Sequence, residues 1–238
     1  MKQAMIFAAG LGTRLKPLTD TMPKALVPVD GQPLLWHVIQ KLKAAGFERL
    51  VVNVHHFAQQ IVDYLQANQH FGLDIRISDE RDMLLETGGG IRKALPLFDQ
   101  NSPVLIHNVD ILSNVDFDLL DAALTTAPDA LLLVSKRTTK RYLQFAADSM
   151  RLVGWKNVAT GEVKGREGLS LAFSGIHVIA PSLMARLADW PLRFPIMDFY
   201  LSECATARIV GVEQPGLCLL DVGKLDTLEE ANEFIKHI

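Results

Sequence analysis

The sequence predicts an α/β fold in which a mostly parallel sheet is covered by helices on both faces. Over residues 1–135, short β-branched runs alternate with amphipathic helical patterns. After Lys136 this rhythm changes, and short strands follow one another as in a small antiparallel elaboration. No internal repeat or long linker divides the 238 residues, so we expect a single domain over 1–238.

The elements expected in residues 1–135 are short apolar strands and helices with apolar residues three or four positions apart. Pro33 and Gly46 are typical start and stop signals and bound the first helix. Strands are expected at Met5–Ala9, Leu50–Val54, Leu73–Ser78, Val104–His107 and Ala130–Ser135. Helices are expected at Pro33–Ala45, Ala58–Asn68, Ile91–Leu97 and Phe117–Leu124.

The elements expected after Lys136 are more mixed. Asp226, followed three positions later by Glu229, fits a capping box at the start of a last helix. A polar loop is expected over Gly161–Gly168. Strands are expected at Leu143–Ala147, Arg151–Trp155, Leu171–Ile179, Arg208–Val212 and Cys218–Leu220, and helices at Pro181–Leu187 and Ile196–Ala205.

The composition is that of an ordinary soluble globular protein, with 49% hydrophobic and 21% charged residues. The net charge of −3 shows no basic excess, so a nucleic-acid partner is not expected. Cys204 and Cys218 lie in apolar surroundings without CxxC spacing and are expected to be buried free thiols. No leader-like segment opens the chain and no run approaches the ~18 apolar residues of a membrane span, which predicts a cytoplasmic protein without membrane contact.

The strongest local motif is the run Ala8-Ala9-Gly10-Leu11-Gly12-Thr13-Arg14, directly after the first expected strand. Glycines at such a place let backbone amides approach phosphate oxygens closely. Leu15 stands where a dinucleotide fingerprint requires its third glycine, and the Walker lysine is missing. A nicotinamide-dependent dehydrogenase and a P-loop enzyme are therefore disfavoured.

Two cations accompany this loop. Arg14 offers a guanidinium fork for two-point phosphate contact, and Lys24 adds a compact charge on a segment stiffened by Pro23. A lone arginine or lysine is usually a solvated surface charge. Because both flank one glycine loop after one buried strand, we assign them to phosphate binding.

Two aspartates follow apolar runs, Asp110 after residues 104–106 and Asp221 after residues 219–220. Carboxylates at strand ends lie where parallel sheets bind ligands, and Mg²⁺ prefers such oxygen ligands. A single aspartate at this position can equally be a turn or helix cap. His107 could contact substrate, although a satisfied structural histidine explains it as well.

Gly10–Arg14 together with Pro23-Lys24-Ala25-Leu26 resembles the signature of the sugar-1-phosphate nucleotidylyltransferases, over almost the whole chain. The resemblance implies a Rossmann-like, doubly wound α/β core with residues 1–135 as the nucleotide-binding half and 136–238 as the sugar-binding half. It implies that Asp110 and Asp221 hold Mg²⁺, and that the nucleotide and its triphosphate contact Ala9, Gly10, Gly12, Thr13, Arg14 and Lys24. Arg14, Lys24 and Asp110 are the expected catalytic residues.

The run Glu86-Thr87-Gly88-Gly89-Gly90 resembles the base-binding turn of that family, although it could be a loose helix-entry turn. Thr87, Gly88 and Gly89 are therefore assigned to the nucleotide. In form it resembles the N-acetylmuramate-1-phosphate uridylyltransferases, whereas several relatives carry Gly-Thr-Ala-Gly, and this favours UTP. For the sugar we expect contacts from Asn108, Lys156, Ser174 and Gly175.

Trp155-Lys156 departs from a Glu-Lys-Pro pattern that is common in the family, which leaves the identity of the sugar open. The expected reaction joins a nucleoside triphosphate to a sugar 1-phosphate and releases pyrophosphate. A guanylyltransferase for mannose or heptose 1-phosphate, a cytidylyltransferase for a phospho-alcohol and a silent regulatory module remain alternatives. The chain is expected to be a monomer or a small homo-oligomer.

Overall fold

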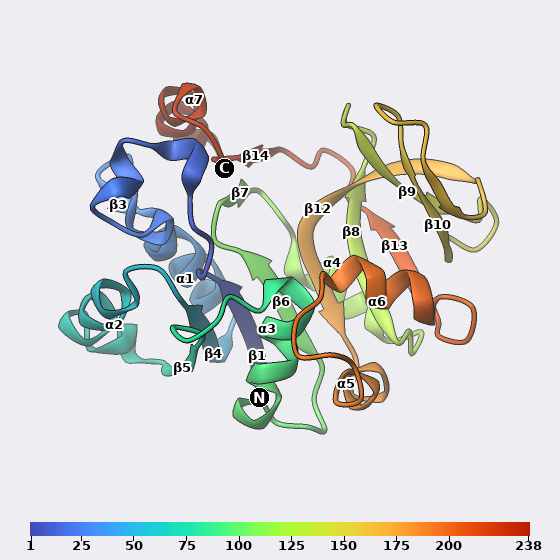
Figure 1. Ribbon diagram of the computed structural model, residues 1–238, viewed down its shortest axis with the longest axis horizontal. Coiled ribbons are helices and arrows are strands. Elements are labelled where there is room, and N and C mark those ends of the chain that lie inside the picture. The colour runs from blue at the N-terminus through green and yellow to red at the C-terminus, as the bar shows by residue number, and fades with distance from the viewer.

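The computed structural model describes all 238 residues and contains one ten-stranded sheet with helices on both of its faces (Figure 1). The protein has two apolar cores, one on each face of the sheet, because successive side chains of a strand point to opposite faces. Ala4 and Ile6 enter one apolar cluster, whereas Met5 between them enters the other. The first cluster is covered by α1, α2, α4 and α7, and the second by α3, α5 and α6. The predicted doubly wound α/β fold is confirmed.

Eight strands, together with four helices, build the first half of the chain. The helices are α1 (Leu34–Ala44), α2 (Ala58–Ala67), α3 (Glu86–Ala94) and α4 (Phe117–Leu124). The sheet strands are β1 (Lys2–Phe7), β4 (Phe47–Val54), β5 (Asp74–Asp79), β6 (Val104–Asn108) and β8 (Ala130–Ser135), and β7 (Ile111–Ser113) lies outside the sheet. The short pair β2 (Pro28–Val29) and β3 (Gln32–Pro33) precedes α1.

The second half adds three helices and further strands, and its β9–β10 pair lies far from α1 and α2 in Figure 1. The helices are α5 (Pro181–Leu187), α6 (Ile196–Glu203) and α7 (Asp226–Phe234). The strands are β9 (Arg141–Phe145), β10 (Leu152–Asn157), β11 (Val163–Gly165), β12 (Leu169–Ile179), β13 (Ile209–Glu213) and β14 (Leu219–Asp221).

The strand order reverses at β1. From β1 the chain runs outward through β4 to β5, and it then returns to place β6 on the other side of β1, with all four strands parallel. The long strand β12 is antiparallel and separates β6 from β8. The pairing of β12 with β8 shifts register between Phe173 and His177, and residues 169–171 of β12 extend past β8 and pair with β9. The antiparallel elaboration is therefore an extension of the main sheet.

Four local expectations are wrong. Cys218, expected to be buried, is exposed. Helix α3 begins at Glu86 rather than at Ile91, because the three glycines belong to the helix and let it pack closely against its neighbours. Residues Val163–Gly165, expected in a loop, form β11, a three-residue strand that is exposed throughout and too short to show an alternating pattern. The expected capping box is absent, since Asp226 caps no amide and the hydroxyl of Thr227 bonds the backbone of Lys224.

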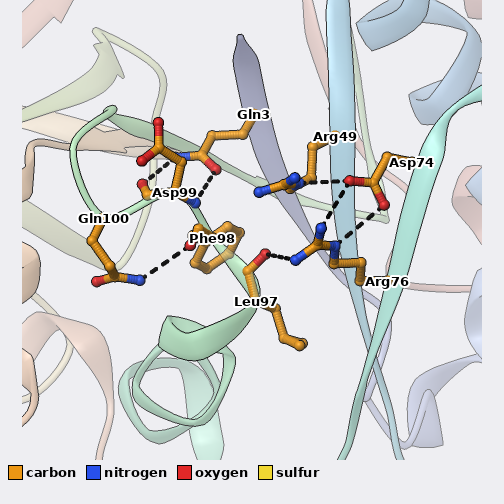
Figure 2. A network of polar contacts seen from close by, with 8 residues as sticks. All are labelled: Gln3, Arg49, Asp74, Arg76, Leu97, Phe98, Asp99 and Gln100. Atoms are coloured by element: carbon orange, nitrogen blue, oxygen red, sulfur yellow. Dashed lines mark hydrogen bonds and ion pairs between the residues drawn. The ribbon is translucent and has the colours of Figure 1, made fainter.

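A polar network fixes the end of the sheet opposite the carboxyl ends of the parallel strands (Figure 2). The amide of Gln3 on β1 donates to the carbonyl of Asp99 at 2.8 Å and accepts from its N–H at 2.9 Å. Asp74 on β5 accepts from Arg49 of β4 at 2.7 Å and also pairs with Arg76. This end of the sheet is therefore cross-linked by side chains from three strands. None of the helices has the length and apolar character that crossing a bilayer requires.

A small cavity of about 180 Å³ is lined by two titratable groups, the partly buried Lys41 of α1 and the buried His107 of β6. Burial lowers the pKa of Lys41 to about 8, and its ammonium donates to the carbonyl of Ser113. Burial also lowers the pKa of His107 to about 4, and its Nδ1 lies 2.8 Å from the carbonyl of Asn108. His107 is thus a buried, satisfied histidine, as one of the two sequence-based interpretations expected.

We predict that Lys41→Met raises the free energy of unfolding at pH 7 by about 1 kcal/mol, because a partly buried ammonium is replaced by an apolar group that needs no hydrogen bond. The folded pKa of about 8 lies below the unfolded value of about 10.4. The penalty is therefore complete below pH 8 and disappears as the pH rises through 10.4. Urea unfolding at pH 7 and at pH 10 measures this, with the exposed Lys43→Met as control. A gain that is equal at both pH values would contradict the assignment.

Candidate active site

A cleft of about 440 Å³ opens where β1 and β6 end, at the position where the strand order reverses. Open α/β sheets bind ligands there because the connections from the two strands leave in opposite directions. The sequence-predicted residues that line this cleft are Ala9, Gly10, Gly12, Thr13, Arg14, Lys24, Thr87, Asn108 and Asp110. The fold thus collects segments from across the first half of the chain in one place.

The glycine loop leaves β1 after Phe7 and turns at Gly12, whose φ of +64° is left-handed. A Cβ on Gly12 would lie 2.8 Å from the methyl group of Thr19, so no side chain fits there. The hydroxyl of Thr19 donates to the carbonyl of Gly12 at 2.8 Å and fixes the turn. Leu15 is buried behind the loop, and this anchors the short turn that presents Thr13 and Arg14 to the cleft.

A buried pair, Asn53 and Glu80, supports this loop and was not found by sequence reasoning. The side-chain oxygen of Asn53 accepts from the amides of Ala8 at 2.7 Å and Ala9 at 3.3 Å. Its amide group donates to Glu80 at 2.7 Å, and the other oxygen of Glu80 accepts from the amide of Leu85 at 3.1 Å. One bridge therefore joins the glycine loop to the start of α3. A polar asparagine within the apolar run of β4 was the available signal.

The predicted cation Lys24 and the predicted carboxylate Asp110 form an ion pair in the cleft. Lys24 is largely buried, with 8% of its surface exposed, and its ammonium has Asp110 as its only carboxylate partner. The lysine lies in a short turn whose start is fixed by the extended conformation of Pro23. The positive charge of Lys24 is thus held close to the glycine loop, and its side chain has little freedom to move.

Asp221 lies beside Asp110 although the two are distant in sequence. Strand β14 pairs antiparallel with β7, which places Asp221 opposite Ile111, and the amide of Val222 donates to the carbonyl of Asp110 at 2.9 Å. Burial raises the pKa of the Asp221 carboxyl, and the neighbouring charge of Asp110 raises it further. Lys24 and Arg14 act in the opposite direction.

This arrangement fits a hard divalent cation. Two carboxylates that repel each other in a partly buried place are relieved by such an ion, which takes oxygen ligands. No group of three His, Cys, Asp or Glu side chains is close enough to hold a metal by itself. The protein would therefore supply two carboxylates and leave the remaining positions to phosphate oxygens and water, as Mg²⁺ commonly requires.

On the base side, the structure separates Thr87 from the two glycines that follow it. Thr87 and Glu86 line the cleft. The amides of Gly88 and Gly89 instead donate to the carbonyl of Phe194, at 2.9 and 3.2 Å. A Cβ on Gly88 would lie 2.2 Å from the Phe194 ring, so these glycines allow α3 to pack closely against that segment. Neither amide is free for a base.

The residues predicted for the sugar are only partly brought together. Asn108 lines the cleft, and a Cβ on Gly175 would lie 2.8 Å from its amide nitrogen. Ser174 is completely buried without a hydrogen-bond partner. Lys156 pairs with Glu167 at 2.8 Å and does not line the cleft. Side chains alternate along β10, so Lys156 points to the face opposite that of Trp155.

A second cavity of about 520 Å³ lies between the β9–β10 pair and α6. Trp155 and Leu143 contribute its apolar surface, and Asp221 contributes to its polar surface. Asp110 lines the first cleft, while its neighbour Asp221 lines the second cavity. The two hollows therefore meet at the pair of carboxylates.

A model of the nucleotidyl transferase family matches residues 3–145, more than half of the chain. The chain therefore belongs to the nucleotidyl transferase family, and the family expected from its sequence is confirmed. It is 37% identical over 229 residues to N-acetylmuramate alpha-1-phosphate uridylyltransferase of Caulobacter vibrioides, covering 91% of this chain and 90% of that relative. The protein of the same name from Neisseria meningitidis is 36% identical over 234 residues, covering 96% of each chain.

Among solved structures, HddC from Yersinia pseudotuberculosis complexed with GMP-PN is similar in fold, with a TM-score of 0.79. The likeness covers 98% of this chain and 99% of that one, at 22% sequence identity. At this identity the comparison speaks for the fold alone, and it extends the agreement to the second half of the chain, beyond the residues that the family model matches.

Gly223→Ala is predicted to reduce nucleotidyl transfer about 100-fold while leaving the fold intact. The added Cβ would lie 2.7 Å from a carboxylate oxygen of Asp221 and 2.8 Å from a guanidinium nitrogen of Arg14. Both groups are side-chain ends that can move, so the cost appears in their positions rather than in folding. Pyrophosphate release and thermal unfolding measure the two effects. The control Gly161→Ala lies in open space and should leave the rate unchanged, while its left-handed φ of +76° makes it a control for a loss of thermal stability as well.

Asn53→Ala is predicted to weaken nucleotide binding at least 10-fold and to destabilise the fold by about 1–3 kcal/mol, since it removes partners from the amides of Ala8 and Ala9 and from the carboxylate of Glu80. Calorimetric titration with nucleotide and chemical unfolding test this. The exposed Asn101→Ala serves as control. Unchanged affinity in Asn53→Ala would show that the bridge does not position the loop.

Proposed function

We propose that this chain transfers the uridylyl group of UTP to N-acetylmuramate 1-phosphate, with Mg²⁺, and releases pyrophosphate. One observation carries the proposal: the cleft with the glycine loop and the cavity beside the antiparallel strands meet at Asp110 and Asp221. Transfer between two phosphorylated substrates needs two binding sites that share a reaction centre. The two relatives that match over nine-tenths of both chains carry the name of this activity.

The chemistry is an in-line displacement at the α-phosphorus of the nucleotide. A phosphate oxygen of the sugar 1-phosphate attacks and forms the new P–O bond, while the bond to pyrophosphate breaks on the opposite side. The attacking phosphate is already an anion at neutral pH, so no side chain has to act as a general base. The task of the protein is to place the two substrates and to neutralise charge.

Arg14 and Lys24 are the residues that neutralise the triphosphate. Arg14 stands at the open side of the glycine loop, and Lys24 is held at Asp110 by its ion pair. The backbone amides of Gly10, Gly12 and Thr13 would add fixed dipoles toward the phosphate oxygens. Because Lys24 is nearly buried, its charge is poorly screened by water and acts strongly on a phosphate in the cleft.

Asp110 and Asp221 would hold the Mg²⁺ ion. When bound, Mg²⁺ supplies charge compensation for the phosphate oxygens of both substrates. The residues around it orient these groups: Lys24 fixes the carboxylate of Asp110, and the pairing of β14 with β7 fixes the backbone of Asp221. Location in the cytoplasm and a monomeric or small homo-oligomeric state stay predictions from the sequence.

The proposal predicts that pyrophosphate is released when UTP is combined with N-acetylmuramate 1-phosphate and Mg²⁺. The panel crosses UTP, GTP, CTP, ATP and dTTP with the 1-phosphates of N-acetylmuramate, N-acetylglucosamine, glucose and mannose. Asp110→Ala and Asp221→Ala should each lower the rate at least 1,000-fold, because the cation loses half of its protein ligands. EDTA should abolish the activity of the unaltered chain.

The outcomes of this panel separate the alternatives. Preference for GTP with mannose 1-phosphate, or for CTP, would replace the proposal by another activity of the same family. Tight nucleotide binding without release from any pair would support a silent regulatory module. Full activity in Asp110→Ala would refute the assigned site.

A further inference from the structure

The second cavity contains an excess of cations that the transfer reaction does not use. Arg137, Arg141 and Lys164 all line it, together with the apolar surface of Trp155. Its carboxylates are Asp198 and Asp221. A neutral sugar ring would not require this concentration of positive charge, since hydroxyl groups are recognised by neutral donors and acceptors as well.

The three cations differ in whether a carboxylate already balances them. Lys164 lies 3.7 Å from Asp198 and 4.0 Å from Glu162, and its ammonium is 5.5 Å from the centre of the Trp155 ring. Arg137 and Arg141 form no ion pair with any carboxylate. Two guanidinium groups at one cavity are thus free to bind an anion.

The frame around the cavity positions these two arginines. Arg137 follows β8 and donates to the carbonyl of Phe173 at 2.8 Å, so one of its nitrogens is fixed while the others stay free. Arg141 begins β9 and lies on the same face of that strand as Leu143, which pairs with Trp155 of β10. Both arginines therefore border one surface that the antiparallel strands build.

We propose that Arg137 and Arg141 form a subsite for a carboxylate carried by the sugar, here the lactyl ether of N-acetylmuramate. The inference rests on the proposed function, because it assigns this cavity to the sugar 1-phosphate. A guanidinium group binds a carboxylate through two parallel hydrogen bonds, a geometry that an ammonium cannot offer. N-acetylglucosamine lacks the lactyl group, so the subsite discriminates between two sugars that are otherwise alike.

The phosphate of the same substrate belongs beside Asp221, where the second cavity meets the cleft that Asp110 lines. A cation held by these two carboxylates would attract that phosphate. Of the two arginines, Arg137 lies closer to the reaction centre along the chain it contacts, because it bonds the carbonyl of Phe173, two residues before the Gly175 that packs against Asn108 of the first cleft. Arg141 is therefore the arginine to test first, since its effect on the lactyl carboxylate is the easier to separate from any effect on the phosphate.

The test measures kcat/KM with UTP for N-acetylmuramate 1-phosphate and for N-acetylglucosamine 1-phosphate in Arg141→Gln, Arg137→Gln and the double variant. We expect the ratio of the two values to fall about 10- to 100-fold in Arg141→Gln, and further in the double variant, because a charge-assisted bond to the lactyl carboxylate is lost. Arg92→Gln is the matched control. Arg92 also bonds a single carbonyl and has no carboxylate partner, but it lies outside this cavity, and its variant should keep the ratio.

A binding experiment separates this inference from the proposed function. Calorimetric titration of the intact chain with free N-acetylmuramate and free N-acetylglucosamine needs no phosphate and no turnover. Tighter binding of N-acetylmuramate that Arg141→Gln removes supports the subsite even if no pair of substrates releases pyrophosphate. Equal losses for both sugar phosphates, or an unchanged ratio in the double variant, overturn the subsite while the proposed function stands.

Discussion

The parallel pairing of β1 with β4 on one side and β6 on the other is the constraint on which the site depends. It places the glycine loop and the segment ending in Asp110 at neighbouring strand ends, so that two loops facing different directions enclose a single cleft. The Gln3–Asp99 and Arg49–Asp74 contacts hold the opposite end of these strands (Figure 2). The strands that carry the cleft are thus also tied together at their opposite ends.

The charged groups of the site balance one another in the free protein and can form new contacts when a substrate binds. Lys24 and Asp110 neutralise each other within the free protein, while Asp221 has a raised pKa beside them. Burying such groups opposes folding, because their ionised forms lose water. The fold tolerates them because they lie at the edge of two large apolar clusters rather than inside either one.

Much of the fold could be predicted because the strands are buried on both faces and the helices have one apolar stripe. The bounds of α4, β8 and α5 agree with the expected ranges for this reason. Local patterns do not report long-range packing, so the sequence does not show that Gly88 lies against the ring of Phe194. Arg14, Lys24 and Asp110 could be predicted from the resemblance, whereas the Asn53–Glu80 bridge exists only after folding.

The segment from Phe194 to Met197 can couple ligand binding in the cleft to ligand binding in the second cavity. The carbonyl of Phe194 accepts hydrogen bonds from the first glycine amides of α3. The amide of Ile196 donates to the hydroxyl of Thr87 at 2.9 Å, in the wall of the cleft. Pro195 and Met197 meanwhile line the second cavity. One short stretch of chain is therefore shared by the walls of two hollows. If a ligand in one hollow shifts this stretch, the affinity of the other hollow changes, and thermodynamic linkage makes that effect equal in both directions.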